Sequence, residues 1–172
     1  KPGKNDNRIR LGGGGQTSSA LARLVQGAQQ RVVIQSPYLV ASDEALALLG
    51  EVRARGVGVR ISTNSLASTD NLPAFSGYRN QRDRLLDMGL QIFGYRPAPK
   101  VQQQLVQRLG AAQRSAPVFA LHAKTLVVDG KTVYIGTFNF DPRSQNLNTE
   151  VGVVIHDEAL ARAVEASIET DM

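Results

Sequence analysis

The sequence predicts an α/β fold in which a mixed, largely parallel β-sheet is sandwiched between helices. Three helix-then-strand units follow one another between residues 18 and 95, an order that typically builds parallel strands with covering helices. Farther along, two apolar runs flank Asp129 and Gly130, which predicts an antiparallel hairpin in the same sheet. The 172 residues are enough for one domain with its own core. We therefore expect a single domain over residues 18–172, preceded by a flexible lead-in over residues 1–17.

The elements of the first half follow from apolar spacing and from turn residues. Residues 12–15 are four glycines without the lysine of a phosphate-binding loop, so we assign them to the lead-in. Apolar side chains recur at helical spacing over residues 18–29, and residues 31–35 are a β-branched strand. Ser42 can cap a second helix that ends at Gly56, before a strand over residues 57–63. A third helix over about residues 75–88 and a strand over residues 90–95 complete this half.

The second half contains the predicted hairpin and closes with a helix. Pro97 and Pro99 interrupt the pattern, and residues 101–109 are typical of a short amphipathic surface helix, with a partner-facing or membrane-surface helix as the alternative. Strands are expected over residues 118–128, 132–135 and 151–155, and a last helix over residues 157–168. The helix-rich first half and the strand-rich second half together give the mixed sheet.

Composition narrows the classes of partner. The formal net charge of +5 favours an anionic partner such as nucleic acid, an acidic lipid surface or a phosphorylated small molecule. The absence of cysteine excludes disulfides and thiolate metal sites. No apolar run reaches the roughly 18 residues that a membrane span requires. Because the chain starts at Lys1 without an initiator methionine, we expect it to be a fragment or a processed form of a longer protein.

Polar residues stand within the two apolar strands of the hairpin. On a strand over residues 118–128, His122 and Lys124 point to the same face. The hairpin brings back Gly136, Thr137 and Asn139, of which the last two again share a face. An imidazole, an ammonium group, a hydroxyl and an amide form a donor set suited to a phosphate, with one group able to attack it. The alternative is an edge strand with one face in water.

The spacing of these residues, HxK, four residues, D, six residues, G, then T-x-N, resembles the signature of the phospholipase D superfamily. The matching residues are His122, Lys124, Asp129, Gly136, Thr137 and Asn139. The stretch LNTEVGVVI supplies the downstream glutamate of that superfamily, Glu150, and SPYLV, TNSLASTD and FNFDPRS resemble the second half of bacterial cardiolipin synthases of the C type. Phe75 stands where this subgroup often has a histidine and Gly94 where it has a glutamate, so the resemblance does not extend to head-group preference.

The resemblance implies a role for each matching residue. His122 would attack phosphorus and form a phosphohistidine, or serve as the general acid and base of a paired site. Lys124 and Asn139 would bind the nonbridging phosphate oxygens, with Thr137 as a further donor, and Glu150 would hold the second nitrogen of the imidazole. Gly136 and Asp129 would support the site, the latter by forming the turn. Tyr38 and Asn64, in the matching segments, are further candidates for substrate binding. No metal and no cofactor are implied.

The superfamily reaction uses two histidines, and this chain has one signature. The second would come from an N-terminal half outside this chain or from a homodimer. We expect a phosphodiester-cleaving or phosphatidyl-transferring enzyme that acts on an anionic phospholipid or another phosphodiester, peripheral at the cytoplasmic face of the inner membrane. The alternatives are a nuclease, favoured by the net charge and by Arg79, Arg82 and Arg84, and a noncatalytic phosphate-binding domain. The other histidine, His156, is interpreted as a surface or capping residue.

Overall fold

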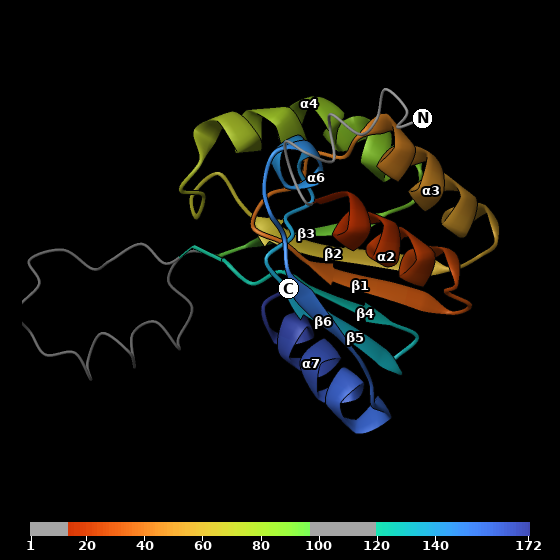
Figure 1. The fold of residues 1–172 in the computed structure, drawn as a ribbon. Helices are drawn as coiled ribbons and strands as arrows, with labels where there is room; N and C mark the ends of the chain where they lie inside the picture. Colours follow the sequence, from red (N-terminus) through yellow and green to blue (C-terminus); the bar gives the residue numbers. More distant parts are fainter. Residues whose placement is uncertain (1–13, 97–119) are drawn as a thin grey trace, which may run out of the picture.

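The computed structural model describes residues 14–96 and 120–172, and within them a single six-stranded sheet forms the centre of the molecule (Figure 1). The strand order is β3-β2-β1-β4-β5-β6. The strands are β1 (Arg31–Gln35), β2 (Gly58–Asn64), β3 (Gln91–Tyr95), β4 (Thr125–Val128), β5 (Thr132–Gly136) and β6 (Gly152–His156). The first three are parallel, and β4, β5 and β6 each pair antiparallel with the preceding neighbour in this order. Four strands therefore run one way and β4 and β6 the other, which confirms the predicted mixed sheet.

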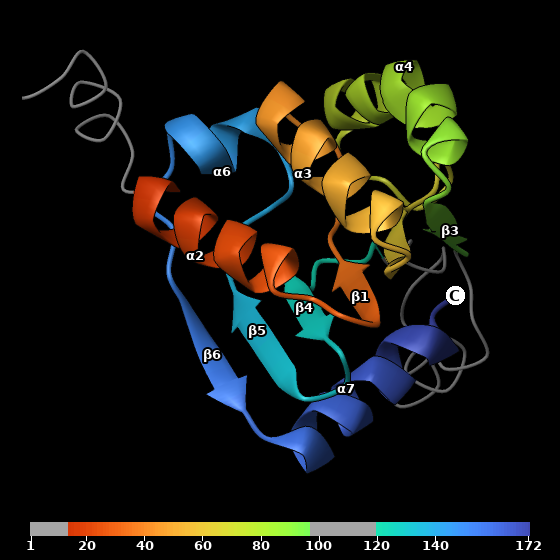
Figure 2. The same ribbon diagram turned by 90° about the vertical axis from the view of Figure 1, so that its right-hand side faces the viewer.

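Helices cover both faces of this sheet. One face carries α2 (Gly14–Gln26), α3 (Asp43–Ala54), α4 (Leu72–Asp87) and the short α6 (Pro142–Asn146), while α7 (Glu158–Thr170) lies against the other (Figures 1 and 2). The larger hydrophobic core lies on the first face and includes the fully buried Ile34, Leu46 and Leu126. Val33, Val127 and Ile168 belong to the smaller core under α7. The predicted sandwich is confirmed.

Polar contacts fix α7 on its face of the sheet. Glu165 is 7% exposed and forms an ion pair with Arg31 of β1, and Glu169 pairs with Arg60 of β2. At the end of the helix, the amide of Gln35 donates to Asp171 at 2.9 Å. These contacts bind α7 to the parallel part of the sheet, whereas β6 remains an edge strand.

The predicted hairpin is present with the expected turn. Asp129 and Gly130 have φ values of 54° and 64°, and the N–H of Lys131 donates to the carbonyl of Val128 at 3.0 Å. Positive φ at both central positions is the hallmark of the type I′ turn, which suits the twist of antiparallel strands. The aspartate–glycine pair is thus required by the backbone at this point.

Several element boundaries differ from the prediction. The first helix begins at Gly14, so residues 14–17, expected in the lead-in, are helical. Helix α4 begins at Leu72 because the side chain of Asn71 caps it by accepting from the N–H of Ala74 at 3.1 Å. Strand β4 begins only at Thr125, so the segment that carries His122 and Lys124 precedes the strand and is not part of it. The predicted helix over residues 101–109 lies outside the described residues.

Helix α6 was not predicted. It is five residues long and begins after Asp141, whose carboxylate accepts from the N–H of Ser144 at 2.8 Å. An aspartate followed by proline is a known start signal for a helix, but the length of α6 leaves no helical repeat of apolar residues. Within the described part of the chain, no helix is long and apolar enough to cross a membrane.

Candidate active site

A cleft of about 830 Å³ lies at one end of the sheet. Its place follows from strand register, because Gln35 at the carboxyl end of β1 pairs with Thr125 at the start of β4. The end of β5 and the start of β6 meet there too, through the pair Gly136 and Gly152. The lining residues are His122, Lys124, Gly136, Thr137, Asn139, Leu147, Asn148, Thr149, Glu150 and Val151. The structure thus brings together six of the nine predicted site residues in one cleft.

His122 lies in the irregular segment between residues 120 and 124, and its side chain is exposed to the cleft. Among the described residues, its imidazole makes no hydrogen bond. The predicted contact with Glu150 is absent, because the carboxylate of Glu150 accepts a hydrogen bond from the hydroxyl of Thr137 instead. The imidazole is therefore accessible to a ligand in the cleft.

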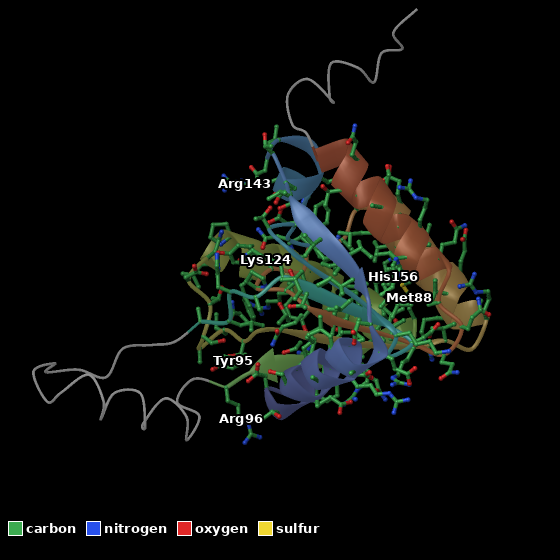
Figure 3. All side chains as sticks on the ribbon, turned by 60° about the horizontal axis from the view of Figure 1, so that its bottom comes forward. Met88, Tyr95, Arg96, Lys124, Arg143 and His156 are labelled. Atoms are coloured by element: carbon green, nitrogen blue, oxygen red, sulfur yellow. The ribbon has the colours of Figure 1, made fainter. Side chains whose placement is uncertain are left out.

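Lys124 is half-buried beside His122, and its ammonium group donates to the carbonyl of His122 at 2.8 Å. Burial lowers the pKa of Lys124, and the carboxylates of Glu150, Asp70 and Asp141 oppose this shift. A partly desolvated cation held by one carbonyl has donors left for an anion. Figure 3 shows Lys124 toward the middle of the molecule, away from the end of β6 that carries His156.

Glu150 and Thr137 continue the pairing of β5 and β6 beyond the strand ends. The N–H of Thr137 donates to the carbonyl of Val151 at 2.9 Å, and the N–H of Val151 donates back to the Thr137 hydroxyl at 3.1 Å. The hydroxyl is thus shared between the backbone of one strand and the carboxylate of Glu150. This arrangement fixes both side chains at the rim of the cleft.

Gly136 is required by a close approach of neighbouring groups. A Cβ atom at this position would lie 2.2 Å from the hydroxyl of Tyr134 and 2.5 Å from the carbonyl oxygen of Val151. Gly152, its partner across the strands, is crowded by the same tyrosine ring, with 2.2 Å to the nearest atom. The two glycines therefore let the tyrosine cross the end of the β5–β6 pair behind the cleft.

Asn139 is held in the cleft by its backbone. Its N–H donates to the hydroxyl of the fully buried Ser144 at 3.1 Å, and its carbonyl accepts from the N–H of Asp141 at 2.8 Å. Its side-chain oxygen is buried and has no partner within the described residues. A buried polar atom without a partner is rare in folded proteins and often marks a functional position.

Asp129 lies outside the cleft. Its carboxylate accepts hydrogen bonds from the N–H groups of Gln29, Gln30 and Arg31 at 2.9, 2.8 and 2.9 Å. Burial by itself raises the pKa of Asp129, but these backbone hydrogen bonds outweigh it and hold the pKa below the ordinary value. The residue ties the β4–β5 turn to the start of β1.

Asn64 and Tyr38, both predicted to bind substrate, do not line the cleft. Asn64 is only 2% exposed, and its side chain is hydrogen bonded to Leu121, Pro37 and Ser68. The hydroxyl of Tyr38 donates to Asp70 at 2.9 Å, and burial together with this carboxylate raises the pKa of Tyr38. Because the side-chain donors and acceptor of Asn64 already bind protein groups, they are not available to a substrate.

The remaining candidates lie elsewhere on the molecule. Exposed His156 has its Nδ1 3.0 Å from the hydroxyl of Thr132, and Asp157 rather than His156 caps α7. Phe75, at one departure from the subgroup pattern, packs edge-on against Tyr78. Arg79, Arg82 and Arg84 are exposed on α4. Over residues 14–96 and 120–172, no three His, Asp or Glu side chains are grouped to bind a metal ion.

Sequence reasoning missed the buried serines and the loop after α6. Ser36 and Ser144 are both fully buried, and their hydroxyls accept from the N–H groups of Phe140 and Asn139. The motif FNFDPRS contains a helix-capping pattern that could have indicated Ser144. Leu147, Asn148 and Thr149 also line the cleft, and they lie outside the signature spacing that identified the other residues.

Comparisons with known proteins agree with this arrangement. A family model described as "Cardiolipin synthase, PLD-like domain" matches residues 21–172. Cardiolipin synthase C from Escherichia coli (strain K12) is 41% identical over 136 residues, which cover 79% of this chain and 28% of that protein. The chain thus spans under a third of this relative's length.

Two solved structures share the fold. The first is a phospholipase D family member, Nuc from Salmonella typhimurium, with a TM-score of 0.66, 18% identity, and coverage of 91% of this chain and 87% of that one. The second is phosphatidylserine synthase from Haemophilus influenzae Rd KW20, with a TM-score of 0.62, 16% identity, and coverage of 90% and 34%. At these identities the likeness concerns the fold.

Proposed function

The chain belongs to the phospholipase D-like domain family of cardiolipin synthases, and from this premise we propose that it supplies one half of an active site that cleaves or transfers phospholipid phosphodiesters. The observation that carries the proposal is the composition of the cleft, whose lining brings His122 together with the donors Lys124 and Asn139 and with Thr137, which becomes a donor when its hydroxyl turns away from Glu150. A nucleophile beside several anion donors is the arrangement that phosphoryl transfer requires.

His122 is the proposed nucleophile. Its free imidazole nitrogen attacks phosphorus, a nitrogen–phosphorus bond forms, and the bond to the leaving alcohol breaks. A second histidine, from outside this chain, protonates the leaving oxygen. Water or an acceptor alcohol, deprotonated by that same histidine, then attacks phosphorus and releases His122. Splitting one difficult displacement into two in this way is the logic of covalent catalysis.

Lys124 and Asn139 stabilise the charge that develops on the nonbridging oxygens. Both line the cleft, and the ammonium group is already partly desolvated. Loss of one preorganised donor of this kind typically costs about 10²–10³ in turnover. Glu150 is proposed as a positioning residue: its carboxylate turns away from the hydroxyl of Thr137 and accepts from a nitrogen of an imidazole.

The site needs a second half, and the edge of the sheet is suited to receive it. Val151 and Val153 are 68% and 55% exposed, and Ile135, the partner of Val153 across the strands, is 42% exposed. An uncovered apolar edge strand is a natural place for pairing with another chain or domain. Since the chain covers 28% of cardiolipin synthase C, we propose that another part of a longer protein fills this role, with a homodimer as the alternative.

We propose a phospholipid as the substrate and the cytoplasmic membrane surface as the place of action. The relative at 41% identity is a cardiolipin synthase. A nuclease and a noncatalytic phosphate-binding domain are alternatives that the following experiment separates.

The test compares His122→Ala with His156→Ala in the full-length protein that contains this chain. Three substrates are offered: phosphatidylglycerol vesicles, single-stranded DNA and the chromogenic diester bis(p-nitrophenyl) phosphate. We expect turnover of phosphatidylglycerol by wild type and by His156→Ala, and a loss of about 10³-fold or more in His122→Ala. Retained binding of inorganic phosphate by His122→Ala would show that the cleft is intact.

Each alternative has its own result. Faster cleavage of DNA than of lipid would favour the nuclease. Equal turnover by wild type and His122→Ala would refute the role of His122 as the nucleophile. Phosphate binding without turnover of any of the three substrates would favour the noncatalytic domain.

A further inference from the structure

Asn64, at the end of β2, holds the main chain immediately before His122. Its side-chain amide donates to the carbonyl of Leu121 at 3.0 Å, and its side-chain oxygen accepts from the N–H of Leu121 at 2.9 Å. One carboxamide therefore pairs with both backbone polar groups of a single residue, as a neighbouring strand would. The distance in sequence between Asn64 and Leu121 makes this a tertiary contact and not a local turn.

Further hydrogen bonds, to Pro37 and Ser68, hold the side chain of Asn64 in place. The same amide donates to the carbonyl of Pro37 at 3.3 Å, and the side-chain oxygen accepts from the hydroxyl of Ser68 at 3.2 Å. Asn64 and Ser68 are 2% and 1% exposed. Every polar group of the carboxamide is thus directed by protein contacts, so its orientation is fixed.

The segment held in this way lacks the pairing of a strand. Strand β4 begins at Thr125, and residues 120–124 are irregular. The next fixed point is the carbonyl of Lys124, which accepts from the N–H of Gly136 at 3.1 Å. His122 lies between these two points, and its own carbonyl is bound by the ammonium group of Lys124.

We propose that Asn64 is a positioning residue for His122: by pairing with Leu121 it fixes the backbone from which the imidazole enters the cleft. The residue takes the place of a missing ladder partner where the chain runs irregularly before β4. The catalytic consequence rests on the function proposed above. The structural consequence, a fixed backbone immediately before His122, does not.

The expected effect follows from the geometry of attack. A reacting nitrogen must lie at about 3–3.5 Å from phosphorus and in line with the leaving oxygen, and a misplacement of about 1 Å can cost about 10²-fold. Loss of the Asn64 contact frees the backbone on one side of His122. The backbone of Lys124 keeps its own contact with the N–H of Gly136, and that of Asn139 keeps its contact with the hydroxyl of Ser144. Turnover should therefore fall far more than phosphate binding.

The experiment uses Asn64→Ala and the isosteric Asn64→Asp. The aspartate keeps the acceptor for the Leu121 N–H but sets an oxygen against the carbonyls of Leu121 and Pro37, so it removes the donor half of the contact, and urea unfolding of both variants measures the accompanying loss of stability. The control is Asn71→Ala, which removes another asparagine side chain that accepts a backbone N–H, that of Ala74, at a helix start. This control loses a similar local contact without any link to His122.

Two readouts distinguish positioning from general stability. The chain has two histidines, so its imidazole signals in an NMR spectrum are easily assigned, with His156 as the internal reference. We expect the His122 signals to shift or broaden in both Asn64 variants while those of His156 stay in place, and neither to change in Asn71→Ala. In the full-length protein, kcat for bis(p-nitrophenyl) phosphate should fall at least about tenfold in Asn64→Ala, with KM and phosphate binding within about twofold.

The outcomes separate this inference from the proposed function. Unchanged His122 signals in the Asn64 variants would overturn the positioning role, whether or not the protein is a diesterase. Changes in the His122 signals in a protein whose wild type turns over no diester would support positioning and count against the function. An equal loss of kcat in Asn71→Ala would mean that stability, not positioning, governs the rate, and would also overturn the inference.

Discussion

Replacement of Asp129 by asparagine tests whether the carboxylate of the signature stabilises the fold and not the reaction. Asparagine fills the same space and also tolerates the positive φ of 54° at this position. Its side-chain oxygen can still accept from Gln30 and Arg31, at the distances of 2.8 and 2.9 Å seen here. The acceptor for the N–H of Gln29 becomes a donor, so this contact, at 2.9 Å, is lost.

The size of the effect follows from these contacts. A hydrogen bond to a charged group contributes about 1.5–3 kcal/mol, and the partial exposure of the carboxylate places the value toward the low end. The two remaining contacts also weaken when the charge is removed. We expect Asp129→Asn to lower the free energy of unfolding by about 2 kcal/mol at pH 7, which for a urea slope of about 2 kcal/mol/M shifts the midpoint by about 1 M.

The pH dependence supplies the decisive measurement. The pKa of Asp129 is lowered in the folded state, so its contribution is full above the pKa of the unfolded chain, near 3.8, and is lost as the pH falls through the folded value. Urea unfolding of both proteins, followed by circular dichroism from pH 7 to pH 2.5, should show the difference in stability shrinking below pH 3.8. Turnover by the folded variant should stay within about twofold of wild type, since the residue lies outside the cleft.

Three results would refute this reasoning. No loss of stability at pH 7 would mean that water satisfies the N–H of Gln29 as well as the carboxylate does. A loss that persists unchanged at pH 2.5 would assign the effect to the turn and not to the charge. A large loss of turnover with normal stability would mean that Asp129 takes part in the reaction.

Gly136→Ala should lower the free energy of unfolding by about 1–3 kcal/mol, because the new Cβ would meet the Tyr134 hydroxyl at 2.2 Å; urea unfolding measures this, and equal stability would show that the ring can move. Lys124→Met should leave stability unchanged or slightly raised, because a partly desolvated ammonium group is removed, while turnover falls about 10²-fold or more. A clear loss of stability in Lys124→Met would show that its contact with the His122 carbonyl matters more for folding than for the reaction.

The sheet and its hairpin could be predicted because the signals were local. The spacing of apolar residues gave β1 without error, and the pair Asp129–Gly130 gave the turn, since only a few residue types accept positive φ at both positions. The start of β4 could not be found in this way. The sequence pattern predicts one strand over residues 118–128. Where the strand actually begins depends on its neighbour β1, which ends at Gln35, the residue that pairs with Thr125.

The site could be predicted as a set of residues but not as a set of contacts. The spacing brought His122, Lys124, Thr137 and Asn139 together because the turn fixes which residues of the two strands face one another. The spacing did not show which donor Glu150 meets here: its carboxylate accepts from the hydroxyl of Thr137, and its contact with an imidazole stays a prediction. Such a choice is decided by fractions of an ångström that no spacing encodes.

Asn64 shows how a polar residue in a matching segment can have a role other than binding. Sequence alone places it beside the site, and its amide suits a phosphate oxygen as well as a backbone carbonyl. Burial decides between the two, because a carboxamide that is 2% exposed must meet its hydrogen bonds inside the protein. The six-residue signature divides in the same way. Four side chains face the cleft, while Asp129 and Gly136 are set by the turn and by the space under Tyr134. Positions that fix the backbone are therefore as necessary to the site as those that do its chemistry, and Asn64 extends that supporting set beyond the signature.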